Sequence, residues 1–221
     1  MIRVARAPEP PDFDAEVRRP GQIAMLELSG QATRRIIPGY SGRVYTSLAT
    51  TIDAIPAARI PALWQGVGLQ LLRTAYKNVC AYLGMALHPS TGAATVDHFL
   101  PKSVAPGLAY EWDNYRLASS SANRSKDDAT GILDPFEIEN DWFFLNLQSG
   151  ELTPQHDLPD EIATAVWNTI AALNLNDPTH RKSRLDAIDA YLGANPSYHV
   201  GLDYLDVEMP VVAWHLRRSR L

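Results

Sequence analysis

The chain has 221 residues, of which 46% are hydrophobic, and a formal net charge of −5 at pH 7. This length and composition exclude a disordered or fibrous chain and allow one sizeable hydrophobic core. The acidic balance disfavours a protein that holds nucleic acid through its overall electrostatic field. Any contact with a polyanion must therefore be local.

The compartment is suggested by the sequence as well. The single cysteine, Cys80, excludes an internal disulfide. The N-terminal residues lack the apolar run of a signal sequence, and no stretch approaches the roughly 18 apolar residues of a membrane span. We therefore expect a cytoplasmic protein with no membrane partner.

The N-terminal half is predicted to contain an arm, a helical region and a strand. The stretch APEPPDFD, residues 7–14, is rich in proline and favours an extended arm. Residues 56–87 are predicted to be mainly helical, because apolar side chains recur there at three- and four-residue spacing. A short strand is predicted at residues 94–100, and Pro101 ends it.

The C-terminal half is predicted to begin with a loop that enters a second short strand within residues 110–117. Three serines, residues 119–121, suit the N-cap of a short helix that ends before Gly131. Residues 133–152 alternate enough to indicate a hairpin. Two helices follow, over residues 159–173 and from about 176–178 to about 192.

The residues with the most informative chemistry lie in TVDHFLPKS, residues 95–103, and YEWDNYRLASSSANRSKDD, residues 110–128. Hydrolysis of a phosphodiester needs a base for water and a divalent cation. Asp97 and Asn123 offer the oxygen ligands that Mg²⁺ prefers. His98 can act as the base, because the usual pKa of histidine is near 6.5. The amide of Asn114 can hold a loop or orient the histidine.

Three cations accompany these residues and are candidates for contacts with phosphate: Lys102, Arg124 and Lys126. Taken singly, an Asp-His pair, an asparagine or a basic cluster is more common as a cap, loop or surface feature. Together and in this order, they favour a nuclease.

The order Asp-His, then Trp-Asp-Asn, then Asn-x-x-Lys-x-Asp resembles the HNH endonucleases. Their ββα-metal motif places Asp-His on the first strand, the middle Asn in the loop and the third residue on the helix. The resemblance implies Asp97 and Asn123 as ligands of Mg²⁺ or Mn²⁺, His98 as general base and Asn114 as the residue that shapes the loop. The third position is Asn123 rather than His, a variant that the family also uses.

One departure from the family concerns zinc. Many HNH proteins hold the motif on a zinc ion through two Cys-x-x-Cys pairs, and the corresponding positions here are Cys80, Leu83, Ser119 and Ala122. Because three of the four thiolates are missing, no structural zinc is expected. We expect apolar packing to replace it.

A wider resemblance concerns the N-terminal arm, the stretch LDPFEIENDWFF and the ending VVAWHLRRSRL. These are similar to bacterial HNH proteins that accompany retrons or partner ATPases in phage defence, including the Septu type. The resemblance implies DNA as substrate and an ATPase subunit as partner. The arm and the arginines of the tail, Arg217, Arg218 and Arg220, are candidate docking elements.

We therefore predict an α+β protein, mainly helical, that encloses a ββα motif at residues 95–128. Its predicted divisions are an N-terminal lead-in at 1–55, a nuclease core at 56–150 and a C-terminal helical region at 151–221. Two alternatives remain open: a catalytically inactive scaffold that keeps the ββα shape, and a nuclease that acts on RNA.

Overall fold

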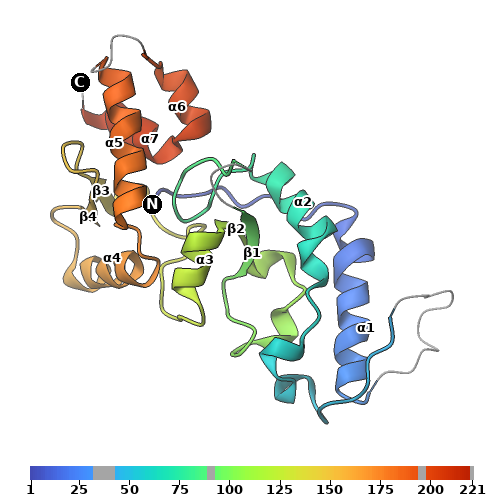
Figure 1. Cartoon of the computed structure of the whole chain (residues 1–221). Coiled ribbons are helices and arrows are strands. Elements are labelled where there is room, and N and C mark those ends of the chain that lie inside the picture. The colour runs from blue at the N-terminus through green and yellow to red at the C-terminus, as the bar shows by residue number, and fades with distance from the viewer. Residues whose placement is uncertain (32–42, 89–92, 194–197, 220–221) are drawn as a thin grey trace. The chain divides into compact units, whose positions relative to one another are not determined.

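The computed structural model describes residues 1–31, 43–88, 93–193 and 198–219. It has an α+β architecture, with helices and two small two-stranded sheets (Figure 1). The chain forms two compact units, each assembled from separate segments. The first unit comprises Met1–Ala7, Tyr76–Thr95 and Leu117–Leu221, and the second comprises Pro8–Ala75 and Val96–Arg116. The three consecutive divisions expected from the sequence stay a prediction.

In the second unit, the Pro-rich arm is irregular only as far as Pro10, and a helical turn at Asp14–Arg18 leads directly into α1 (Arg19–Leu28). Phe13 is buried against the rings of Trp112 and Tyr115, at centroid distances of 5.2 and 5.6 Å. Burial of an aromatic ring stabilises this junction. The arm therefore ends earlier than predicted, because Phe13 is part of the core.

The prediction of a mainly helical segment at residues 56–87 is largely wrong. Short 3₁₀ turns at Ala57–Arg59 and Leu63–Gln65 precede α2, which covers only Val67–Ala75. Positive φ angles at Lys77 and Asn78 end the helical region. Residues 79–86 then fold back on themselves, with an antiparallel bridge between Val79 and Ala86. Their apolar spacing reflects burial in a tight turn rather than a helical stripe.

The segment that carries the candidate residues has the predicted order of strand, loop, strand and helix. Strands β1 (Ala94–His98) and β2 (Tyr115–Ser119) pair, and α3 (Ser120–Lys126) follows β2 directly. The Ser119 side chain caps α3 by accepting a hydrogen bond from the Ala122 N–H. Asp127, with φ of 46°, ends the helix.

The two helices predicted after residue 158 are confirmed, whereas the hairpin predicted over residues 133–152 is restricted to residues 143–154, because residues 133–142 form turns. A hairpin pairs β3 (Phe143–Leu145) with antiparallel β4 (Leu152–Pro154). Helix α4 covers Asp160–Ala172, and α5 covers Pro178–Leu192 with Asp177 as its N-cap. Two further helices, α6 (Leu202–Glu208) and α7 (Pro210–Ser219), complete this unit.

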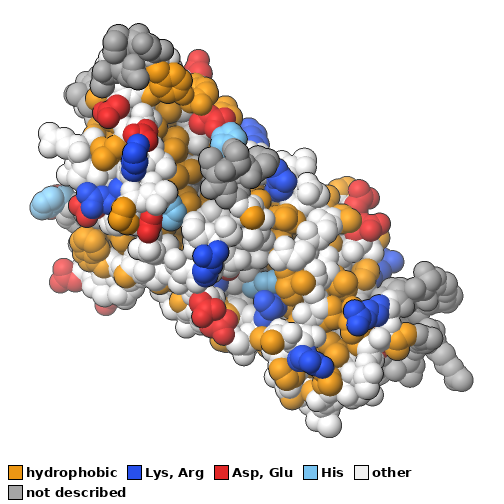
Figure 2. Space-filling view, in the orientation of Figure 1, with side chains coloured by type: hydrophobic (Ala, Val, Ile, Leu, Met, Phe, Trp, Pro, Cys, Tyr) orange, Lys and Arg blue, Asp and Glu red, His pale blue; other side chains and the backbone are white. Residues whose placement is uncertain are grey.

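The surface carries charges of both signs. On the face shown in Figure 2, acidic and basic side chains of the described residues are interspersed with hydrophobic ones. This distribution agrees with the absence of a strong basic balance in the composition. Among the described residues, no helix has both the length and the apolar character that crossing a membrane requires.

Candidate active site

His98 ends β1 and is buried in the second unit. Its Nε2 lies 2.8 Å from the carbonyl oxygen of Ala109. The edges of the Trp64 and Tyr115 rings enclose the imidazole, at centroid distances of 4.5 and 5.2 Å. A carbonyl can only accept a hydrogen bond, so Nε2 carries the hydrogen and the lone pair of the neutral ring is on Nδ1. The surroundings thus fix both the tautomer and the orientation of His98.

The Ala109 carbonyl is shared with a second donor. The Tyr115 hydroxyl also donates to it, over 2.8 Å. Burial raises the pKa of Tyr115, so this hydroxyl keeps its proton. Because the Tyr115 hydroxyl remains protonated, it continues to donate to the Ala109 carbonyl and holds this carbonyl where it accepts the His98 N–H.

Asn114 holds the loop between β1 and β2. Its Oδ1 accepts a hydrogen bond from the Leu100 N–H over 2.8 Å. Its Nδ2 donates to the carbonyls of Leu100 and Leu108, over 3.1 and 3.2 Å. The three hydrogen bonds of this buried amide hold the loop after Asp97-His98 at Leu100 and Leu108. None of these three hydrogen bonds involves His98.

The register of the two strands sets the environment of Asp97. The Phe99 N–H donates to the Asn114 carbonyl, and the Thr95 hydroxyl donates to the Ala118 carbonyl. The residue number decreases from Phe99 to Thr95 on β1 while its partner's number increases from Asn114 to Ala118 on β2, so the two strands are antiparallel. Midway between them, the register sets Asp97 opposite Arg116, and both side chains are buried.

Arg116 was not identified from the sequence as a site residue. Its Nη1 donates to the carbonyls of Asp113 and Tyr115, over 2.7 and 2.9 Å, and its guanidinium lies 4.9 Å from the centroid of the Phe99 ring. A signal was present in the sequence: a lone cation in the middle of the apolar stretch YRLAS, two residues after Asn114. A buried charge in a strand needs partners, and here carbonyls and a ring supply them.

Asn123 lies on α3, in the first unit. Its Nδ2 donates to the Thr95 hydroxyl over 3.1 Å. Thr95 is two residues before Asp97 on β1, and residues two apart on a strand point to the same face. This hydrogen bond also orients the Asn123 amide, because Nδ2 faces the Thr95 hydroxyl and Oδ1 points away from it.

The three predicted phosphate contacts differ in exposure. Arg124 is exposed on α3. Lys102, in the second unit, is partly buried, with its Nζ 5.1 Å from the centroid of the Trp64 ring. Lys126 is 1% exposed, which differs from the surface position that a contact with phosphate requires.

The structure thus describes the predicted residues in two groups. Asp97, His98, Asn114 and Lys102 belong to the second unit, and Asn123, Arg124 and Lys126 belong to the first. Asp97 and Asn123 offer carboxylate and amide oxygens, the donor set of a hard cation such as Mg²⁺ that keeps several water ligands. The residue types therefore fit such a cation.

The positions that correspond to the zinc ligands of HNH proteins are all buried in the first unit: Cys80, Leu83, Ser119 and Ala122. The Cys80 sulfur accepts hydrogen bonds from the N–H groups of Leu83 and Ser119, over 3.4 and 3.3 Å. Burial raises the pKa of the Cys80 thiol. Leucine and alanine side chains cannot bind a metal, so this donor set does not fit a zinc ion.

Comparison with known proteins adds no relative. No protein-family model matches the chain, and no curated protein is similar to it.

Proposed function

We propose that the chain is a metal-dependent endonuclease of the HNH type, which hydrolyses phosphodiester bonds in DNA. The observation that carries this proposal is the fixed imidazole of His98. Its Nε2–H is committed to the Ala109 carbonyl, so Nδ1 is the basic nitrogen of the neutral ring. A general base needs its unprotonated atom in a defined orientation, and this contact supplies one.

In this proposal, Asp97 and Asn123 hold Mg²⁺ or Mn²⁺. When bound there, such a cation would stabilise the negative charge that develops on the phosphate and on the leaving oxygen. His98 takes a proton from water at Nδ1, the water oxygen attacks phosphorus, and the bond from phosphorus to the leaving oxygen breaks. Asn114 keeps the loop that begins at His98 in one conformation. Arg124 and Lys102 contact phosphates of the substrate strand.

The biological setting that we propose is phage defence, together with an ATPase subunit. The wider sequence resemblance supports this setting, and so does the net charge of −5, which favours delivery of DNA by a basic partner. Of the tail arginines suggested as docking elements, Arg217 forms an ion pair with Asp206, and Arg218 lies over the Trp214 ring. Arg220 is outside the described residues.

The test is a plasmid assay with the purified chain, Mg²⁺ or Mn²⁺, and supercoiled DNA. We expect conversion to nicked or linear forms, lost with EDTA and reduced at least 100-fold in His98→Ala and Asp97→Ala, since a general base typically contributes 10²–10⁴-fold. His156→Ala is the matched control, because its side chain is 97% exposed. It should cleave like the wild type.

The outcomes separate the alternatives. Cleavage that survives in both His98→Ala and Asp97→Ala would contradict the assignment of the site. If the isolated chain does not cleave, the assay is repeated with the proteins encoded beside it and with single-stranded RNA. Cleavage that appears only with a partner indicates a gated nuclease, and its absence in every arm indicates the inactive scaffold.

A further inference from the structure

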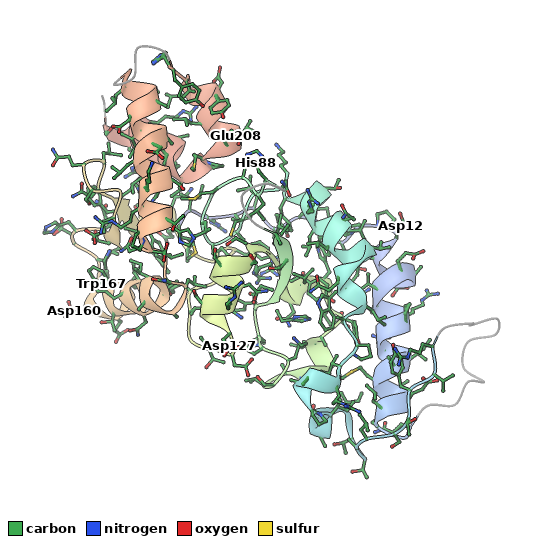
Figure 3. The ribbon with its side chains drawn as sticks, in the orientation of Figure 1. Asp12, His88, Asp127, Asp160, Trp167 and Glu208 are labelled. Atoms are coloured by element: carbon green, nitrogen blue, oxygen red, sulfur yellow. The ribbon has the colours of Figure 1, made fainter. Side chains whose placement is uncertain are left out.

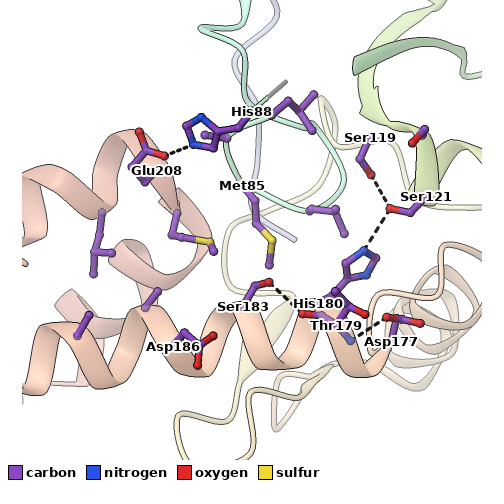
Figure 4. A pocket seen from close by; sticks show the side chains of 18 of the residues that line it. Met85, His88, Ser119, Ser121, Asp177, Thr179, His180, Ser183, Asp186 and Glu208 are labelled. Atoms are coloured by element: carbon purple, nitrogen blue, oxygen red, sulfur yellow. Dashed lines mark hydrogen bonds and ion pairs between the residues drawn. The ribbon is translucent and has the colours of Figure 1, made fainter. Parts of the chain in front are cut away.

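A cavity of about 630 Å³ lies in the first unit between α5, α6, the loop at residues 83–88 and the start of α3 (Figure 4). Helix α5 lines it with Ser183, Ala187 and Ala190. These residues are three or four apart and share one face of the helix. Because their side chains are small, the face leaves a hollow, and its volume is in the range of pockets for small ligands.

One end of the cavity is a chain of polar groups. The Ser121 hydroxyl lies 3.2 Å from His180 Nε2 and 3.0 Å from the Ser119 hydroxyl (Figure 4). His180 Nδ1 lies 3.3 Å from the Asn174 carbonyl, so Nδ1 carries the hydrogen and Nε2 accepts from Ser121. Burial lowers the pKa of His180, which keeps the ring neutral. The donors and acceptors at this end are therefore fixed.

The opposite end carries a His-Glu pair. His88 Nε2 lies 2.6 Å from Glu208 Oε2, and the two side chains meet at the edge of α6 (Figures 3 and 4). Met85 lies between the two ends, and Leu87 and Met209 also line the cavity. A space with polar ends and an apolar middle suits a flat heteroaromatic ring that has hydrogen-bonding edges.

The charge at the rim comes from Arg124. It lines the cavity and is exposed, and its guanidinium makes no hydrogen bond or ion pair with any of the described residues. The acidic side chains of the lining are already bonded: Glu208 to His88, Asp186 to Lys182 and Asp177 to the Thr179 N–H. Arg124 also follows Asn123 directly, so an anion here lies beside the proposed metal ligand.

From these contacts we infer that the cavity binds a nucleotide, with the base between the His180 and His88 ends and the phosphate on Arg124. The choice of ligand rests on the proposed nuclease function. Beside the Oε2 atom that contacts His88, Glu208 has a second carboxylate oxygen that can accept an N–H group of a base edge, and guanine presents two such donors on its Watson–Crick edge. The nucleotide has two possible sources: an unpaired residue of the substrate strand, or a free nucleotide.

The experiment measures binding in EDTA, where a metal-dependent cleavage site is silent. The probes are GMP, guanosine and a 5′-phosphorylated single-stranded DNA oligonucleotide, titrated by calorimetry into the full chain. Ala187→Trp fills the cavity from α5, and Asp189→Trp is its control, because Asp189 is exposed on the same helix and does not line the cavity. Circular dichroism and thermal unfolding establish that both variants fold.

We expect Ala187→Trp to weaken GMP binding at least tenfold and Asp189→Trp to change it less than twofold. Arg124→Gln, at an exposed position, should reduce the affinity for GMP to that for guanosine. Oligonucleotide binding that is lost in Ala187→Trp identifies a strand residue, whereas binding of GMP alone identifies a free nucleotide. If neither GMP nor the oligonucleotide binds, or if Ala187→Trp binds them like the wild type, the inference is overturned.

This result is independent of the plasmid assay. Nucleotide binding with no cleavage in any arm of the plasmid assay, partner proteins and RNA included, would support the nucleotide pocket and contradict the nuclease. Cleavage with no nucleotide binding would keep the nuclease and remove the pocket, leaving the cavity to a ligand of other chemistry.

Discussion

At the scale of single residues, His215 shows two opposing effects on one imidazole. It is buried on α7, with Nδ1 2.7 Å from the Val211 carbonyl and Nε2 2.9 Å from the Phe143 carbonyl. Both carbonyls favour a doubly protonated ring, because each accepts an N–H. Burial opposes this effect and outweighs it, lowering the pKa of His215 from 6.5 to about 4. The neutral ring therefore leaves one of these two contacts without a hydrogen.

The lowered pKa of His215 predicts a pH dependence of stability. Between pH 6.5 and about 4, the unfolded chain binds a proton at His215 that the folded chain does not. The free energy of unfolding therefore falls as the pH falls through this window, by at most about 3 kcal/mol. Urea unfolding at pH 7 and pH 4.5 measures it. We expect His215→Gln to lose less stability over this range than the wild type, and His156→Gln to behave like the wild type. Equal losses in His215→Gln and the wild type would contradict the prediction.

At the scale of elements, the sequence predicted best where local chemistry decides the structure. Proline at the first position and aspartate at the N-cap define the start of α5, and Ser119 defines the start of α3. Residues 56–87 were predicted wrongly because their apolar side chains, although spaced as in a helix, are buried in turns. The burial of a turn depends on contacts with residues that are distant in the sequence. Gly84 illustrates this, since a Cβ there would lie 2.9 Å from the Val211 Cβ.

The same distinction applies to the candidate site. The order of residues in the motif led to the proposal of Asp97, His98, Asn114 and Asn123 as site residues, and Asn114 makes three hydrogen bonds to the loop after His98. The burial of Lys126 could not be predicted from spacing, because it depends on segments far away in the chain, whereas the apolar stretch around Arg116 held a signal for a buried cation. Local patterns gave the candidates for the proposed site but not their exposure.

The turn that contains Cys80 leads to a prediction about zinc. Two N–H groups already point at the Cys80 sulfur, and the three positions that would complete a thiolate site are buried around it. We expect the combined variant Leu83→Cys, Ser119→Cys and Ala122→Cys to bind Zn²⁺, with a gain of about 2.7 kcal/mol in unfolding free energy at a zinc concentration of 100 times Kd. Leu83→Cys alone should show no gain.

Two measurements check this expectation. Thermal unfolding with and without Zn²⁺ gives the stabilisation, and the visible absorption spectrum of the Co²⁺ complex reports tetrahedral thiolate coordination. A combined variant that folds but binds Co²⁺ without this spectrum would show that the four positions do not form a thiolate site. The proposed kinship with zinc-bearing HNH proteins would then lose its support from this part of the fold.

At the scale of the whole molecule, the net charge limits the ways in which the proposed DNA substrate can be bound. The net charge is −5, and of the three predicted phosphate contacts only Arg124 and Lys102 retain some exposure. The proposed contact with DNA therefore cannot depend on attraction by a broad basic surface. The local contacts that remain are few, so a partner has a clear physical role in bringing the substrate.

This charge distribution predicts weak DNA binding by the isolated chain. We expect Kd on the order of 10⁻⁴ to 10⁻⁶ M at physiological salt, and a slope of log K against log salt of about −2 for two phosphate contacts. Fluorescence anisotropy with a labelled duplex in EDTA measures both quantities. Arg124→Gln should reduce the slope by about 1, and Arg6→Gln, whose guanidinium pairs with Glu137, should not. A tight complex that is insensitive to salt would argue against delivery by a partner.

The division of the chain into two units has a consequence for any attempt to separate them. The chain passes from one unit to the other four times, and two of these passages fall within β1 and β2, after Thr95 and after Arg116. Asp97 and His98 lie on one side of these passages, and Asn123 lies on the other. A fragment that keeps either unit alone therefore loses part of the residue set. We therefore expect each fragment alone to be inactive in the plasmid assay. If cleavage returns only when the two fragments are mixed, the chain would be a candidate for a split nuclease.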